Sequence, residues 1–375
     1  MSGGVDSSVV AYLLKKKGYH NLEGVYMRNW DTADERGVCT SEEDYRDVQA
    51  VCRYIGIPCR RVDFVKEYWT DVFSYALQAY SQGETPNPDI MCNREIKFGA
   101  LVNYARAALA GPDESPVWIA TGHYARTSCH GPNGQPSPML TTSKLEPVRL
   151  LRGQDPRKDQ SYYLSGLSQA QLRRTLFPLG GLHKAVVKDL AREAGLPTAS
   201  KKESMGICFV GKRRHFADFL GEYLPTTPGP ILDSTGAEIG THPGLYRFTI
   251  GQRARIHHGP HKWFVYAKDP TRNAIRVVPG RDHPWLFTMA FTAGNVHWIA
   301  GEPPEKLVSG GVMLDVQVRY LQVPGRGLVT LRSDGSLRVQ VVRPVRGLAP
   351  GQFAVLYDGD RCLGNAVIKS PEIDA

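Results

Sequence analysis

The chain opens on Met1-Ser-Gly-Gly-Val-Asp-Ser-Ser8, which joins two adjacent glycines to side chains typical of a helix start. Gly3 and Gly4 allow a tight backbone turn that can approach an anion closely. Residues 6–8 are of cap-forming types, and the run after them has helical apolar spacing that stops at Gly18. Because a helix N-terminus presents free N–H groups and the positive end of its dipole, the stretch predicts a phosphate cradle. An ordinary turn before a helix explains so short a motif equally well, and the Gly-Lys-Ser/Thr ending of a Walker loop is missing.

A loop of this kind normally follows a buried parallel strand, yet only Met1 precedes Ser2. We therefore expect either a fragment or alternative start, or the loss of the first strand. Either puts the completeness of the nucleotide site in doubt.

Composition places the chain among soluble globular proteins large enough for two or three domains. It has 375 residues, 42% of them hydrophobic, and a formal net charge of +9, which favours a polyanionic partner. No apolar run reaches membrane-spanning length, and no signal peptide is visible. The seven cysteines lack a disulfide-framework spacing, which indicates a reducing compartment. The sequence contains no CxxC pair, so we expect no structural zinc site.

Strand-like and helix-like segments alternate through the first half of the chain. Strands are expected at 22–27, 60–64 and 117–121, and helices at 40–55, 66–82, 95–109, 168–175 and 183–195. This order predicts an α/β fold with a parallel sheet, whose ligands bind beyond the carboxyl ends of the strands. Met27, Gly122 and His123 would lie there, and the polar stretch 127–148 is expected to be a surface insertion.

From about residue 226 proline and glycine become frequent and apolar residues alternate. Residues 312–320 predict a half-buried strand, and further short strands are expected at 263–267, 274–278, 327–332, 337–342 and 353–357. Their spacing indicates two small β-rich domains, the last a β-barrel. We expect three domains, at 1–212, 213–283 and 284–375.

Two of the cysteines stand in surroundings that would lower a thiol pKa. Cys92 follows the proline-stiffened turn Thr85-Pro-Asn-Pro-Asp89 and precedes the helix expected at 95–109. Cys208 lies in a small-residue loop between basic residues at 201–202 and 212–214. A packed cysteine is the simpler interpretation of each, and spacing does not bring the two together.

The whole set of motifs occurs in an order that resembles the tRNA-specific 2-thiouridylase family. The first motif, SGGxDS, is the signature of the PP-loop ATP pyrophosphatases. The set continues with Met27-Arg-Asn-Trp30, Thr85-Pro-Asn-Pro-Asp-Ile-Met-Cys-Asn93, Ile96-Lys-Phe98, Ala120-Thr-Gly-His-Tyr124, Lys158-Asp-Gln-Ser161, Gly206-Ile-Cys-Phe209, Gly251-Gln-Arg253, Arg319-Tyr320 and Pro350-Gly-Gln352. Each motif is weak alone, but the ordered set is specific and covers nearly the whole chain. The runs at 201–206 and 297–304 look most like the animal mitochondrial branch, which implies a mitochondrial location, with the cytoplasm as the alternative.

The resemblance implies ATP-dependent 2-thiolation of the wobble uridine of tRNA. ATP, with Mg²⁺, would adenylate the uridine C2 oxygen, and a persulfide on Cys208 would then deliver sulfur while Cys92 resolves the linkage as a disulfide. The partners implied are the tRNA anticodon loop and a sulfur-relay protein or cysteine desulfurase, with no membrane.

The resemblance also assigns residues, and several have a plainer interpretation. Asp89 would exchange a proton with the base, although turn capping after Pro88 explains it as well. Asp6 would help to order magnesium, although helix capping explains it too, and no protein metal site is expected. Arg319 and Tyr320 would also suit an ordinary barrel strand, and Lys158 a solvated charge. The nucleotide would be bound by Ser2, Gly3, Gly4, Val5, Asp6, Ser7, Met27 and Gly122, and the tRNA by Asn87, Pro88, Asp89, His123, Lys158, Asp159, Gln160, Arg319, Tyr320 and Gln352.

Two other functions share part of this pattern. Another PP-loop adenylating ligase or synthetase would have the opening loop but no need of the Cys92/Cys208 pair or the β-rich half. A catalytically impaired, N-terminally truncated tRNA-binding form would release no pyrophosphate in the presence of tRNA.

Overall fold

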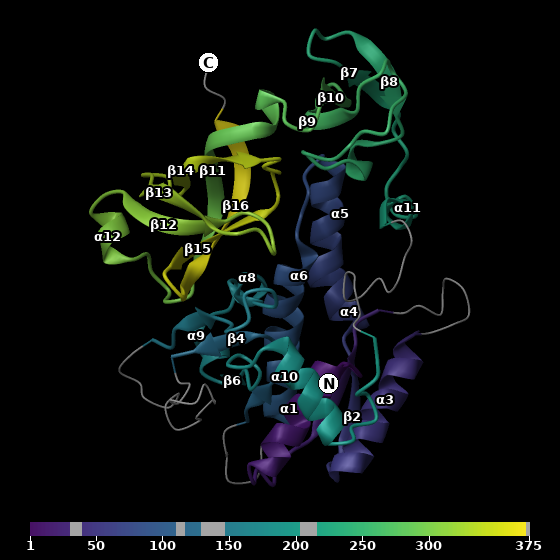
Figure 1. Cartoon of the computed structure of the whole chain (residues 1–375), viewed down its shortest axis with the longest axis vertical. Coiled ribbons are helices and arrows are strands. Elements are labelled where there is room, and N and C mark those ends of the chain that lie inside the picture. Colours follow the sequence, from purple (N-terminus) through teal and green to yellow (C-terminus); the bar gives the residue numbers. More distant parts are fainter. Residues whose placement is uncertain (31–39, 110–116, 129–146, 203–215, 373–375) are drawn as a thin grey trace.

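The computed structural model describes residues 1–30, 40–109, 117–128, 147–202 and 216–372. Figure 1 shows three bodies: the N-terminal half with the helices, a β-barrel, and a smaller sheet next to the end of the helical run that closes with α5 (Ser74–Ser81). Within the described residues, no helix is both long enough and apolar enough to cross a membrane. Cys208 lies outside the described residues, as do most of the surface insertion expected at 127–148 and the run 203–206.

Parallel strand pairs and flanking helices form the N-terminal half, as predicted. Strand β1 (Gly24–Arg28) pairs in parallel with β2 (Cys59–Asp63), and β3 (Ile119–Ala120) with β6 (Thr175–Leu176). Helix α1 (Val5–Lys16) buries Val9 and Leu14 against Val187 and Ala191 of α10 (Lys184–Glu193). On the other side, α3 (Thr40–Ile55) packs against α1 and β1.

Two long helical runs each contain a π-helical stretch. The first is α4 (Val65–Tyr68), η1 (Trp69–Phe73) and α5 (Ser74–Ser81), which agrees with the helix expected at 66–82. The second is α6 (Pro88–Met91), η2 (Cys92–Ala100) and α7 (Leu101–Leu109). It begins seven residues before the predicted start, because Asn87 caps it and Pro88 takes the first helical position, where proline is favoured.

Shorter elements complete this half. Ser168 and Gln171 form a capping box on α9 (Gln169–Leu172), which is shorter than the helix expected at 168–175. The remaining short helices of the chain are α8 (Ser161–Leu164), α11 (Phe216–Leu220) and α12 (Glu305–Val308).

The central region is a four-stranded sheet in the order β8-β7-β10-β9. Ile231, Val265, Ile275 and Val277 form its core. Its elements are β7 (Gly229–Leu232), β8 (Glu238–His242), the 3-10 turn η4 (Leu245–Arg247), β9 (Trp263–Asp269) and β10 (Ala274–Pro279).

The C-terminal region is a closed six-stranded barrel, as predicted. Its sheet runs β11-β14-β13-β12-β15-β16 and closes through the β11–β16 pairing. The 3-10 turn η5 (Pro284–Leu286) leads into it, and β4 (Ala125–Thr127) and β5 (Leu150–Arg152) extend its sheet beyond β16. The barrel strands are β11 (Phe287–Trp298), β12 (Val312–Gln317), β13 (Gly325–Leu331), β14 (Leu337–Arg346), β15 (Phe353–Asp358) and β16 (Arg361–Glu372).

One difference from the sequence prediction concerns the strand expected at 312–320. It ends at Gln317, so Arg319 and Tyr320 lie in the turn that follows β12. Leu321, next in this turn, has a φ of +62°, a left-handed conformation that a strand cannot continue through. Because of this turn, the Tyr320 ring packs against the main core cluster and not inside the barrel.

The barrel and the N-terminal half share one apolar core. Phe353, Val355 and Tyr357 of β15 are buried in the same cluster as Ile90 and Cys92. Polar contacts cross the same boundary: the Tyr162 hydroxyl donates to the Phe353 carbonyl at 3.1 Å, and Asn365 Nδ2 to Ser165 Oγ at 2.9 Å. The barrel is therefore fixed against the helices that carry the site.

Candidate functional site

The opening loop has the backbone geometry of an anion cradle. Gly3 has a φ of +73°, and a Cβ there would lie 2.6 Å from the Asp44 carbonyl oxygen, so only glycine fits. Gly4 is the N-cap of α1, and no side chain occupies the cap. The Ser8 hydroxyl donates backwards to the Gly4 carbonyl at 2.9 Å. The cap-forming side chains therefore leave the first N–H groups of α1 for a ligand.

Gly122 lies directly against this loop. A Cβ at Gly122 would come within 3.1 Å of both Asp6 Cβ and Ser7 N. The loop also contacts β1, because the Met1 ammonium donates to the Val25 carbonyl. Met27 follows on β1, where its side chain packs against the large core cluster. Both predicted nucleotide contacts thus lie at carboxyl ends of parallel strands.

Asp6 is engaged by two residues that sequence reasoning missed. Its Oδ1 accepts from Lys184 Nζ at 2.6 Å and from the Tyr124 hydroxyl at 2.9 Å. Lys184 is buried at the start of α10. Asp6 neither caps α1 nor offers both oxygens freely to a metal, and within the described residues no cluster of three acidic, histidine or cysteine side chains could hold one. No spacing in the sequence points to a pair 178 residues apart.

The chain leading toward Cys208 is fixed beside the same loop. Thr198 Oγ1 donates to Ser8 Oγ at 2.9 Å. Lys201 forms ion pairs with Asp44, at 2.6 Å, and with Asp47 of α3. Asp44 is the residue whose carbonyl abuts Gly3. Thr198 and Lys201 therefore lie next to the opening loop.

A second group of predicted residues meets where the N-terminal half touches the barrel. Gln352 Nε2 donates to the carbonyls of Thr85, at 2.8 Å, and Pro86, at 3.2 Å. Thr85 N donates to the Pro350 carbonyl at 2.8 Å. Asn87 lies 3.5 Å from Gln352 Oε1 and also caps α6 by accepting from Ile90 N. We call residues 83–93 with these barrel partners the base region.

Tyr320 joins the base region. Burial, Asp159 and Asp89 together raise the pKa of Tyr320 to about 12. Its ring lies 4.3 Å from that of Tyr163, whose carbonyl accepts from Asn93 Nδ2. Asp89 is the second helical residue of α6, so Asn87, and not Asp89, provides the cap. Arg319 extends outward and donates to the Gly347 carbonyl at 2.8 Å.

Cys92 does not precede a helix, as the sequence suggested, but lies inside one. It is the fifth helical residue after the Asn87 cap and is 2% exposed in the main apolar cluster. The dipole effect is strongest in the first turn, so the predicted thiolate stabilisation loses its main cause. The base region still contains this sulfur, next to Asn93.

The segment 158–160 connects the two groups. Gln160 Oε1 accepts from Tyr124 N at 3.0 Å, and Tyr124 in turn bonds Asp6. Asp159 accepts from Gly153 N and Ser161 N, and burial raises its pKa although those bonds oppose the shift. Lys158 is partly exposed on the same turn. Asp159 and Gln160 thus have structural roles whatever else they contact.

His123 lies between aromatic rings. Its ring centroid is 5.8 Å from Phe98 and 6.3 Å from Phe177, and its Nδ1 is 2.9 Å from Thr121 Oγ1. Burial, and then the charge of Lys97, hold the pKa of His123 well below its usual value. His123 is therefore neutral at pH 7 and serves as a hydrogen-bonding ring.

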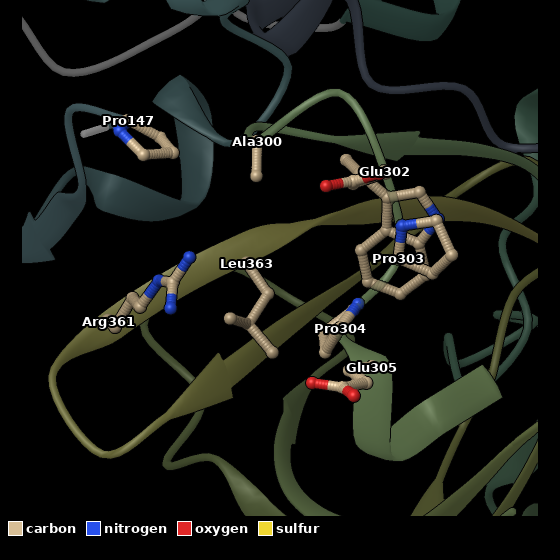
Figure 2. A pocket seen from close by; sticks show the side chains of 9 residues that line it. Pro147, Ala300, Glu302, Pro303, Pro304, Glu305, Arg361 and Leu363 are labelled. Atoms are coloured by element: carbon tan, nitrogen blue, oxygen red, sulfur yellow. The ribbon is translucent and has the colours of Figure 1, made fainter. Parts of the chain in front are cut away.

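One cavity lies apart from the predicted residues. It has a volume of about 230 Å³ and lies between the end of β11, α12 and β16. Figure 2 shows Arg361 of β16 and Glu305 of α12 reaching it from different elements. None of its lining residues belongs to the loop or the base region.

Comparison with known families agrees with this arrangement of regions. The tRNA methyl transferase HUP domain matches residues 1–212, the tRNA methyl transferase PRC-barrel domain matches 217–279, and the aminomethyltransferase beta-barrel domain matches 288–368. These three matches agree with the fold class expected from the sequence.

Similar proteins are found along almost the full length. The chain is 45% identical over 373 residues to tRNA-specific 2-thiouridylase MnmA of Lacticaseibacillus paracasei, covering 98% of this chain and 92% of that protein. MnmA 1 of Geobacillus kaustophilus is 44% identical, with 98% and 94% covered. MnmA of Halalkalibacterium halodurans is 45% identical, with 98% and 93% covered.

These relatives are bacterial, so the expectation of a mitochondrial location is wrong, whereas the cytoplasmic alternative is compatible with them. The short runs at 201–206 and 297–304 were too small a sample of the sequence to identify a branch. With family matches over all three regions and relatives near 45% identity end to end, the chain belongs to the tRNA-specific 2-thiouridylase family.

Proposed function

We propose that this protein is a tRNA sulfurtransferase that uses ATP to replace the C2 oxygen of the wobble uridine with sulfur. The observation that carries the proposal is the convergence of Asn87, Asp89, Tyr320 and Gln352 around a helix that contains Cys92. A phosphate cradle in the same N-terminal half supplies the means of activation. The proposed domains are 1–212 for catalysis, 213–283 for the central sheet and 284–375 for the barrel.

The first step is adenylation of the base. Uridine C2 is a poor electrophile until its oxygen becomes a leaving group, so that oxygen attacks the α-phosphorus of ATP and pyrophosphate departs. Residues 2–7 hold the departing phosphates through free N–H groups of α1, with Met27 and Gly122 beside the nucleotide. Lys184 keeps Asp6 oriented and adds a positive charge near the loop. A magnesium ion accompanying ATP would be held mainly by the phosphates, with Asp6 Oδ2 as its protein contact.

Target recognition takes place in the base region. An anticodon-loop base can be turned out of its stack and held by stacking and by hydrogen bonds to its edge. Tyr320 offers an aromatic face, Asn87 an amide, and Asp89 a carboxylate able to exchange the N3 proton. Pro88 fixes the start of the helix on which they lie. His123, Lys158, Asp159, Gln160, Arg319 and Gln352 are proposed as further tRNA contacts.

Sulfur transfer then uses two cysteines. The terminal sulfur of a Cys208 persulfide attacks C2, AMP leaves with the former C2 oxygen, and a C2–S–S–Cys208 linkage forms. The Cys92 thiolate attacks Cys208 Sγ, which releases 2-thiouridine and leaves a Cys92–Cys208 disulfide. A thiol reductant returns that disulfide to two thiols, and an upstream sulfur-relay or desulfurase protein restores the persulfide. Because Cys92 is buried, its neighbours must rearrange before the sulfurs meet.

Mass spectrometry of nucleosides from tRNA incubated with the protein, ATP, a thiol reductant and a cysteine desulfurase with cysteine, which supplies persulfide sulfur, tests this function. We expect 2-thiouridine with the wild type, none without ATP, and none with Cys208→Ser, which should still bind tRNA. Cys92→Ser should stop turnover, whereas the control Cys59→Ser, at a half-buried position outside both regions, should not. Retained 2-thiouridine in Cys208→Ser would contradict the mechanism, and absence of product with the wild type would contradict the function.

A further inference from the structure

Three arginines from different segments meet where the central sheet adjoins the barrel. Arg281 follows β10, Arg319 follows β12, and Arg346 ends β14. Arg346 Nε donates to the Arg281 carbonyl at 3.0 Å and Nη2 to the Gly251 carbonyl at 3.2 Å. Backbone carbonyls, and not carboxylates, thus hold the guanidinium groups of Arg346 and Arg319 in place. We call Arg281, Arg319 and Arg346, with Trp285, the arginine junction.

Among the described residues, the arginine junction has three like charges and one acidic neighbour. Burial, Arg281 and Arg319 lower the pKa of Arg346, and Asp282 is the acidic neighbour that opposes the shift. Within the described ranges, none of the three arginines forms an ion pair with a carboxylate. Like charges held this close repel one another, and an anion bound between them would relieve that repulsion.

An exposed aromatic side chain lies on the turn η5, two residues before Phe287, which pairs with Arg346. Trp285 is 52% exposed, and its ring lies 5.2 Å from Tyr266 and 5.4 Å from His283. Gly347 N donates to the Leu286 carbonyl at 2.7 Å, which fixes the Trp285 turn beside Arg346. Guanidinium groups next to an exposed aromatic side chain are typical of surfaces that bind RNA backbone and sugars.

We propose that the arginine junction binds the phosphate backbone of the tRNA stem adjoining the target base. The argument for RNA as occupant is continuity, because Arg319 is followed directly by Tyr320, which belongs to the base region. A guanidinium group can donate two parallel hydrogen bonds to phosphate oxygens. Three such groups close together can bind successive phosphates of a backbone that carries one charge per nucleotide. This inference rests on the proposed function and adds Arg281, Trp285 and Arg346 to its substrate contacts.

The test is tRNA affinity measured over a range of salt concentrations. Arg346→Gln and Arg281→Gln should each weaken binding about tenfold and reduce the slope of log K against log salt by about one. The loss should be equal for substrate tRNAs of different sequence, because phosphates carry no base identity. Trp285→Ala should weaken binding by a smaller factor. The matched control is Arg343→Gln, an exposed arginine on the same strand, which should bind as the wild type does.

The variants separate a binding role from a structural one. Arg346 also holds two carbonyls, so its loss can disturb the fold, whereas the exposed Arg281 side chain makes no hydrogen bond within the described part of the chain. If the wild type thiolates tRNA but Arg281→Gln binds tRNA with unchanged affinity and salt slope, this inference is wrong while the proposed function still holds. A variant that binds tRNA normally but loses an acidic protein partner would also overturn this inference. A wild type without thiolation would overturn the proposed function.

Discussion

The loop region and the base region are built in opposite ways. The loop region comprises residues 1–8 with Gly122, Tyr124 and Lys184, all within the N-terminal half. The base region is held from three sides: by its own helix, by Lys268 of the central sheet and by Gln352 of the barrel. Under the proposed function, nucleotide binding therefore uses one domain, whereas target recognition uses all three.

The largest effect is expected for Lys184→Met. The change leaves the partly buried Asp6 carboxylate without its cation, and losing one partner of such a pair is strongly destabilising. We expect pyrophosphate release to fall about a hundredfold in kcat/KM and ATP affinity to weaken, while tRNA affinity stays unchanged. Lys188→Met, at an exposed lysine one turn along α10, is the control. Full activity in Lys184→Met would show that the loop does not depend on this ion pair.

Gln352→Ala should affect the base region alone. Two carbonyls lose the donor that fixes them, and we expect about a tenfold loss in thiolation with unchanged ATP affinity. Gln352→Glu should be worse than alanine, because a carboxylate faces those carbonyls without a proton to donate. The control is Gln340→Glu, on an exposed glutamine whose Oε1 accepts from Arg338. If glutamate performed as well as glutamine, the hydrogen bonds would not be what positions the segment.

The same difference decides what the sequence could predict. The glycine loop at residues 1–8, Gly122 and the alternation of strands and helices depend on local patterns, so the sequence predicts where they lie along the chain. Lys184 was missed because nothing local marks a pair so distant in sequence. In the base region, Asn87, Asp89 and Gln352 came only from the family resemblance. The helix start was misplaced because the cap, Asn87, stands between two prolines and the stretch was interpreted as a turn. Cys92 was misjudged for the same reason.

The smallest effect on thiolation is expected for Lys268, the contact from the central sheet, whose loss should change mainly how stability depends on pH. Its Nζ donates to the Gly83 carbonyl at 2.8 Å, and burial lowers its pKa to about 7, with Glu84 opposing the shift. His242 is a further titratable neighbour, whose pKa is lowered by burial and then by the charge of Lys268, against a hydrogen bond with the Asn273 carbonyl. Because the unfolded chain binds this proton up to a pKa of about 10.4, it holds more protons than the folded chain between pH 7 and 10.

The contribution of Lys268 to stability should therefore rise with pH across that window. Denaturant unfolding at pH 7 and pH 9 should show the wild type gaining about 2 kcal/mol relative to Lys268→Met. Lys262→Met, at an exposed lysine before the same strand, should show no such gain. A difference that shrinks as pH rises would mean that Lys268 is charged when it holds Gly83, and the central sheet would then support the base region through an ion rather than a neutral amine.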